Sequence, residues 1–176
     1  MQLTDRDPGL KRFFICGSAL PGQPDHKNLQ SAKFGKFRET QDEELLRQQE
    51  IGGILQLADH VNSPNIPSLY ISVEDGVALP FNLLKRGIEF VRLEKAQNRN
   101  VLIACGAGIS RLVAFAIASL KEEEHLGLLD AFQQVLAKHP QARPHLALWQ
   151  SLCEYYDENL PYKDILKLVL QQKAMY

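Results

Sequence analysis

Apolar and polar positions follow two different periods along the chain, one typical of strands and the other of helices. Short apolar runs at residues 13–16, 53–58, 68–73 and 101–104 predict strands. The run 101–104 is apolar throughout, as in a strand that is buried on both faces. The run 13–16 ends at Gly17, and the run 68–73 leads into Glu74-Asp75-Gly76.

Helical spacing marks the segments between and after these runs. Within residues 80–97, Phe81, Leu84, Ile88 and Val91 recur on one face. Further helices are predicted at 109–123, 127–138, 144–158 and 161–173, and a shorter one follows a capping box at residues 40–43. The alternation predicts an α/β fold with a compact, mostly parallel central sheet flanked by helices, whose helical C-terminal half covers one face of the sheet.

Composition limits the classes of function. The 176 residues suit one domain spanning 1–176, and 20 Lys and Arg against 21 Asp and Glu give a net charge of −1. This balance argues against nucleic acid or an anionic membrane as the partner. The three cysteines, Cys16, Cys105 and Cys153, are too far apart for a chelating pair or a disulfide scaffold. The opening residues MQLTDRDP lack the order of a secretory signal, so we expect a reducing, cytoplasmic location.

One segment requires a test for membrane insertion. Residues 101–120 match the length of a bilayer-spanning helix and contain a single charged residue, Arg111. Arg111 lies at the midpoint, where insertion would cost roughly 2.5–3.5 kcal/mol, and glycines precede it. We therefore expect no membrane span here.

The strongest candidate for chemistry lies between the predicted strand 101–104 and the helix that follows. Cys105 and Arg111 bracket five small or neutral residues in a loop with two glycines. Backbone N–H groups at such a strand-to-helix turn can surround a phosphate, sulfate or vanadate, and the helix dipole favours the thiolate form of Cys105. Arg111 can hold two phosphoryl oxygens. The candidate phosphate-binding residues are Gly106, Ala107, Gly108, Ile109, Ser110 and Arg111.

A thiolate nucleophile also needs an acid for the leaving oxygen, and Asp75 is the candidate. Strand 68–73, helix 80–97 and strand 101–104 form a βαβ unit, so the two strands are parallel and end at the same edge of the sheet. Asp75 follows the first of them and Cys105 the second, in adjacent loops where open α/β sheets bind ligands. Glu74 is the alternative acid, although its side chain is expected to point away.

These residues resemble a known family, the cysteine-dependent protein tyrosine phosphatases, and most closely the compact dual-specificity phosphatases. CGAGISR is similar to the Cys-x-x-Gly-x-x-Arg motif of the family. FFICGSAL, EIGGILQLAD and ISVEDG resemble its strands, and LGLLDAFQQVLAKHPQARPHLALWQSL resembles its late helices. The resemblance implies a metal-free and cofactor-free hydrolase in which Cys105 is the nucleophile, Arg111 binds phosphate and Asp75 acts as acid and then as base.

Two positions depart from the family pattern. Ala104 stands where the family usually has a histidine that organises the loop, and Leu112 stands where it usually has a hydroxyl that stabilises the leaving thiolate. The loop 106–110 contains no Lys or Arg, so phosphotyrosine or phosphothreonine in a protein is the expected substrate, with small phosphomonoesters as a further class. The departures keep a second function open, that of a weakly active or inactive phosphate-binding pseudophosphatase.

Each candidate residue also has an explanation that involves no function. Cys105 alone would be a small core residue, as Cys16 and Cys153 are expected to be. Asp75 alone would be a turn residue before Gly76. The histidines show no ligand spacing, so no metal site is expected. The basic run at 33–38 is either a solvated surface or an attraction for acidic substrate segments.

Overall fold

The computed structural model describes residues 13–15, 43–48, 50–63 and 65–174. Cys16, the loop after it, the basic run at 33–38 and the first residues of the capping box lie outside the described residues. Within them, the expected α/β fold with a parallel sheet is confirmed.

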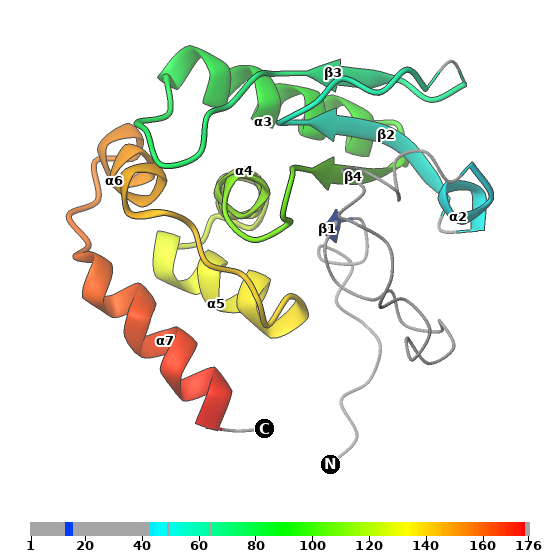
Figure 1. The fold of residues 1–176 in the computed structure, drawn as a ribbon. Coiled ribbons are helices and arrows are strands. Elements are labelled where there is room, and N and C mark those ends of the chain that lie inside the picture. The colour runs from blue at the N-terminus through cyan, green and yellow to red at the C-terminus, as the bar shows by residue number, and fades with distance from the viewer. Residues whose placement is uncertain (1–12, 16–42, 49, 64, 175–176) are drawn as a thin grey trace.

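Four parallel strands form the central sheet in the order β1-β4-β2-β3. Their bounds are Phe13–Ile15 for β1, Ile51–Gln56 for β2, Ser68–Tyr70 for β3 and Asn100–Ala104 for β4. Gln56 pairs with Ala104 on one side and with Tyr70 on the other. The segments after β2, β3 and β4 therefore leave the sheet at one edge, toward which the arrows in Figure 1 point.

Six helices complete the described fold. They are α2 (Glu43–Gln48), α3 (Phe81–Ala96), α4 (Arg111–Glu124), α5 (Leu128–Lys138), α6 (Leu146–Tyr155) and α7 (Tyr162–Ala174). Helix α4 lies between the sheet and α5 and also contacts α3 and α6 (Figure 1). Every residue from 112 to 120 is buried, as its apolar sequence predicts, so α4 is the centre of the hydrophobic core.

Several predicted boundaries are wrong by a few residues. The strand predicted at 68–73 ends at Tyr70, although the N–H groups of Ile71 and Val73 still donate to carbonyls of the segment 56–57. The strand predicted at 53–58 spans Ile51–Gln56 instead. The helix predicted from residue 109 begins at Arg111, because the carbonyl of Ile109 accepts a hydrogen bond from the Arg143 N–H.

The last two helices are also shorter or shifted relative to the sequence prediction. The helix predicted at 144–158 is α6, which starts only after His145 and ends before Asp157, whose φ of 53° is left-handed.

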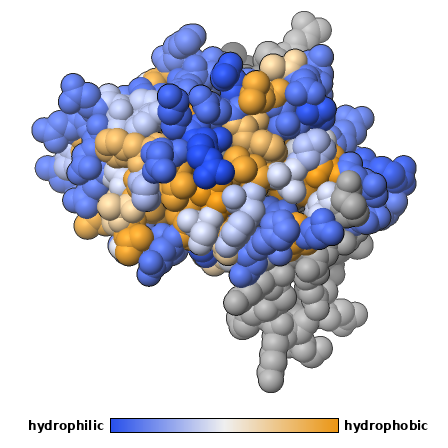
Figure 2. Space-filling view, turned by 90° about the horizontal axis from the view of Figure 1, so that it is seen from above, coloured by the Kyte–Doolittle hydropathy of each residue, from blue (hydrophilic) through white to orange (hydrophobic). Residues whose placement is uncertain are grey.

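Within the described part of the chain, no helix is long and apolar enough to cross a membrane. On the face seen in Figure 2, hydrophilic side chains dominate the rim and hydrophobic ones gather nearer the middle.

Candidate active site

The loop from Cys105 to Ser110 connects the last residue of β4 to the first residue of α4. Gly108 has a φ of 72°, a left-handed conformation that glycine adopts readily. A Cβ at Gly106 would lie 2.9 Å from Arg111 Nη2, so a larger residue here would displace the end of the arginine side chain from its present position. Gly108 therefore suits the course of the loop, and Gly106 leaves room for the guanidinium beside it.

Cys105 is the first residue of this loop and is only 3% exposed. Its thiol is free. Ala104 before it and Leu112 after Arg111 are both fully buried. The two departures from the family pattern thus lie in the core on either side of the loop, where neither contributes a hydroxyl or an imidazole to it.

The Arg111 guanidinium makes one hydrogen bond to the backbone, and its Nε–H group is available for another. Its Nη1 donates to the carbonyl of Val73 at 3.1 Å, which ties the start of α4 to the segment after β3. Its Nε is buried, and within the described part of the chain it has no hydrogen-bond partner. Buried donors are normally paired. An unpaired guanidinium N–H next to a glycine loop is suited to an oxyanion.

Asp75 lies against the loop, as the βαβ argument predicts. The Ser110 hydroxyl donates to Asp75 Oδ1 at 2.7 Å. Gly76 follows with a φ of 85° and turns the chain. Among the described residues, Glu74 has no hydrogen bond to the loop. Ser110 holds the position before α4 without capping the helix, because its hydroxyl bonds to the carboxylate instead.

The segment between α5 and α6 holds the same loop from another side, which the sequence did not predict. His139 Nε2–H donates to the carbonyl of Gly108 at 2.6 Å, and the Arg143 N–H donates to the carbonyl of Ile109 at 2.8 Å. The His145 N–H donates to the Ser110 hydroxyl at 3.0 Å. Three successive loop residues are thus fixed by this segment. The Arg143-Pro144 step was visible in the sequence, but nothing in the pattern identified its partner.

Two histidines in this segment differ in environment. His139 is fully buried, and burial lowers the pKa of its imidazole, while the hydrogen bond to Gly108 opposes that shift. His145 is exposed, and its Nδ1 accepts from the Ala147 N–H at 3.2 Å, which caps α6. A Cβ at Gly76 would lie 3.7 Å from its ring, so His145 stands beside the Asp75 turn.

Other candidates from the sequence lie elsewhere. Cys153 is half-buried, its thiol donates to the carbonyl of Leu160 at 3.6 Å, and burial raises its pKa, which favours the unreactive thiol. In the part of the chain that the structure describes, no group of His, Cys, Asp and Glu side chains is arranged to hold a metal ion.

The parallel sheet, the buried cysteine and the arginine-bearing glycine loop define the class of cysteine-dependent phosphatase folds. Residues 34–158 match the model of the dual specificity phosphatase catalytic domain. The chain is 31% identical over 134 residues to dual specificity protein phosphatase 16 of Homo sapiens, an alignment that covers 72% of this chain and 20% of that protein. The chain belongs to the dual-specificity phosphatase family. It spans about a fifth of the length of that relative.

Solved structures agree on the fold. The crystal structure of DUSP15 superposes with a TM-score of 0.64 at 25% identity, covering 81% of this chain and 90% of that one. The human tyrosine phosphatase-like serine/threonine/tyrosine-interacting protein superposes with a TM-score of 0.63 at 21% identity, covering 70% and 89%. At 21% identity, this second similarity carries the fold and not the activity.

Proposed function

We propose that the chain is a phosphomonoester hydrolase that forms a phosphocysteine on Cys105. The observation that carries the proposal is the Arg111 guanidinium, which stands beside the glycine loop with its buried Nε unpaired among the residues that the structure describes. The same loop begins with a free thiol, that of Cys105, and at its other end the Ser110 hydroxyl holds the carboxylate of Asp75. An anion receptor alone needs neither of these two groups.

In the first step, the Cys105 thiolate attacks phosphorus while the bond from phosphorus to the leaving oxygen breaks. The S–P bond forms, and the leaving oxygen takes its proton from Asp75. The non-bridging oxygens are stabilised by the N–H groups of the loop and by Arg111. Ser110 donates to Oδ1 of the carboxyl group, so Oδ2 is left to carry the proton that is transferred.

In the second step, the ionised Asp75 takes a proton from a water molecule that attacks phosphorus. The P–S bond breaks, the thiolate of Cys105 is restored, and inorganic phosphate leaves. The reaction needs neither a metal ion nor a cofactor. We place the reaction in the cytoplasm as part of the same proposal.

The preferred substrate is phosphotyrosine or phosphothreonine in a protein. Three apolar side chains next to site residues are exposed: Val77 at 43%, Ile109 at 38% and Leu146 at 42%. They follow Gly76, lie within the loop and follow His145, respectively. Apolar groups at these positions favour an aromatic phosphoester, and the loop supplies no further cation for a polyphosphate.

Hydrolysis of 4-nitrophenyl phosphate by three proteins tests the proposal. We expect turnover by the natural chain and none by Cys105→Ser, which keeps the loop and Arg111 and should still bind vanadate. Arg111→Lys keeps the charge but loses the planar fork, so both binding and rate should fall. Turnover by Cys105→Ser would exclude the covalent mechanism.

The buried Ala104 and Leu112 favour one second candidate, a phosphate-binding module with little or no turnover. Such a module would bind vanadate as the enzyme does but would hydrolyse no aryl phosphate. Calorimetric titration with vanadate alongside the turnover assay therefore distinguishes the two functions.

A further inference from the structure

Helices α3 and α4 contact each other at two points that are two turns apart on both helices. At the first point, the ring of Phe115 packs on Gly87, where a Cβ would lie 2.3 Å from Phe115 Cε1. At the second, Lys95 forms an ion pair with Glu123. The helices are thus held together on both sides of the turn that lies between.

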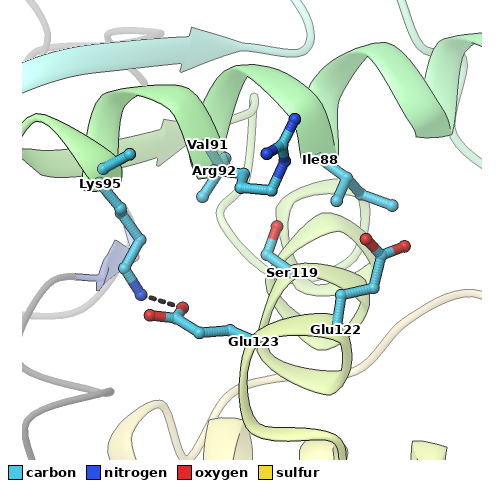
Figure 3. Close-up of a pocket in the computed structure, with 8 residues that line it drawn as sticks. Ile88, Val91, Arg92, Lys95, Ser119, Glu122 and Glu123 are labelled. Carbon is cyan, nitrogen blue, oxygen red and sulfur yellow. Dashed lines mark hydrogen bonds and ion pairs between the residues drawn. The ribbon is translucent and has the colours of Figure 1, made fainter.

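That intervening turn leaves a cavity of about 290 Å³ between the two helices (Figure 3). Ile88 and Val91 of α3 form its apolar wall, and Ser119 of α4 faces them. Ser119 follows Phe115 by one helical turn. The cavity exists because a small side chain stands at the position where the preceding turn of α4 carries a phenyl ring.

The hydroxyl of Ser119 marks the cavity as a site that can recognise a polar group. Ser119 is 5% exposed, and its Oγ has no hydrogen-bond partner among the described residues. Its hydroxyl points into the cavity in Figure 3. Leaving a buried hydroxyl unpaired is unfavourable, and a ligand that hydrogen-bonds to it removes this penalty.

The charged groups around the cavity favour a neutral ligand. Lys95 and Glu123 neutralise each other at one end. Arg92 and Glu122, both exposed, bring opposite charges from the two helices, and Glu122 also accepts a hydrogen bond from the Tyr156 hydroxyl at 2.8 Å. The lining therefore carries no net charge, so neither an anion nor a cation gains from it.

We propose that this cavity is a binding site for a small neutral molecule made of one apolar ring and a carboxamide. The ring would lie on Ile88 and Val91, the carboxamide oxygen would accept from Ser119, and its NH₂ group would donate toward Glu122. The volume is at the lower end of the range for small-molecule sites, about 300–1,000 Å³, which suits a single ring. The site is formed by the second halves of α3 and α4, whereas the candidate phosphate loop precedes α4.

Benzamide is the probe, titrated into the full chain and followed by ¹H–¹⁵N NMR. We expect saturable shifts in the second halves of α3 and α4. Ser119→Ala should weaken binding about three- to tenfold, the effect of losing one hydrogen bond. Ser119→Leu should abolish binding by filling the cavity, and Ser68→Ala, a matched change at an exposed serine of β3, should leave it unchanged.

Three results would overturn this site: shifts that do not saturate, equal affinity of the natural chain and Ser119→Ala, or a soaked crystal in which only water reaches the Ser119 hydroxyl. Because Ser119→Ala is a small deletion, the test does not depend on whether Ser119→Leu folds. Binding is measured without turnover, so it stands or falls separately from the phosphatase proposal.

Discussion

At Asp75, one hydrogen bond from Ser110 fixes the carboxylate beside the candidate phosphate loop. We predict that Asp75→Asn lowers kcat/KM, which reports the step in which the leaving group departs, by about 10²–10⁴ on phenyl phosphate, whose leaving group needs a proton. The loss should be much smaller on 4-nitrophenyl phosphate, because nitrophenolate departs without one. Steady-state kinetics on both substrates measure the contrast.

Glu74→Gln is the matched control, since Glu74 is the neighbouring exposed carboxylate and should leave both rates unchanged. Equal losses on the two substrates in Asp75→Asn would mean that Asp75 is a turn residue only. A loss confined to Glu74→Gln would transfer the acid role to that residue.

Substitution of Leu112 should have different kinetic effects if the chain is an inefficient enzyme than if it only binds phosphate. Its side chain is fully buried and offers no hydrogen bond to the Cys105 sulfur. We expect breakdown of phosphocysteine to limit turnover, so rapid mixing should show a burst of released alcohol before a slower steady state. Leu112→Ser should raise the steady-state rate and reduce the burst.

The same substitution should lower the free energy of unfolding by about 1.5–3 kcal/mol, because a buried leucine is lost. Urea denaturation measures the fraction of the variant that is folded, and the turnover rates are calculated per folded molecule. A folded Leu112→Ser with unchanged turnover, from a parent without a burst, would show that this position does not limit the reaction.

Among the elements, the segment between α5 and α6 makes three hydrogen bonds to the loop. His139 donates to Gly108, and neighbouring residues hold Ile109 and Ser110. We predict that His139→Leu weakens vanadate binding about three- to tenfold, as expected for one lost hydrogen bond, and that His139→Gln restores it by presenting an N–H at a similar position. Equal affinity of the natural chain and His139→Leu would remove His139 from the organisation of the loop.

The buried imidazole of His139 also predicts a pH dependence of stability. Burial lowers the pKa of His139 in the folded chain below the 6.5 of an exposed imidazole. As pH falls through 6.5, the unfolded chain binds a proton that the folded chain does not, so the free energy of unfolding decreases. The slope is at most about 1.4 kcal/mol per pH unit and vanishes below the folded-state pKa.

Urea denaturation between pH 7.5 and 5.5 measures this slope. His139→Gln lacks the titrating group and should show a shallower decrease than the natural chain. Identical slopes for the two proteins would mean that His139 binds its proton equally well in the folded and unfolded states.

The elements also explain how far the sequence could predict the site. Apolar runs at β3 and β4 and the βαβ connection were sufficient to bring Asp75 and Cys105 to one sheet edge, although β2 lies between the two strands and the sequence did not predict that. The contacts of His139, Arg143 and His145 were not predictable, because hydrogen bonds to loop carbonyls and hydroxyls have no sequence period. The cavity at Ser119 depends on the register of two helices, which neither helix determines alone.

For the whole molecule, the fold places the candidate site residues around the start of α4. The loop and the Asp75 segment both leave the sheet at one edge, and α4, buried from residue 112 to 120, fixes the place of Arg111 at its start. The late helices cover α4 and supply the segment that holds the loop. The fold class and this site arrangement together support a covalent mechanism at Cys105.

Mass spectrometry of the protein quenched in acid during turnover of 4-nitrophenyl phosphate tests that mechanism most directly. We predict that the peptide containing Cys105 gains the mass of one HPO₃ group, and that this adduct is absent from Cys105→Ser. Steady turnover with no adduct on Cys105, or with the adduct on another residue, would contradict the account.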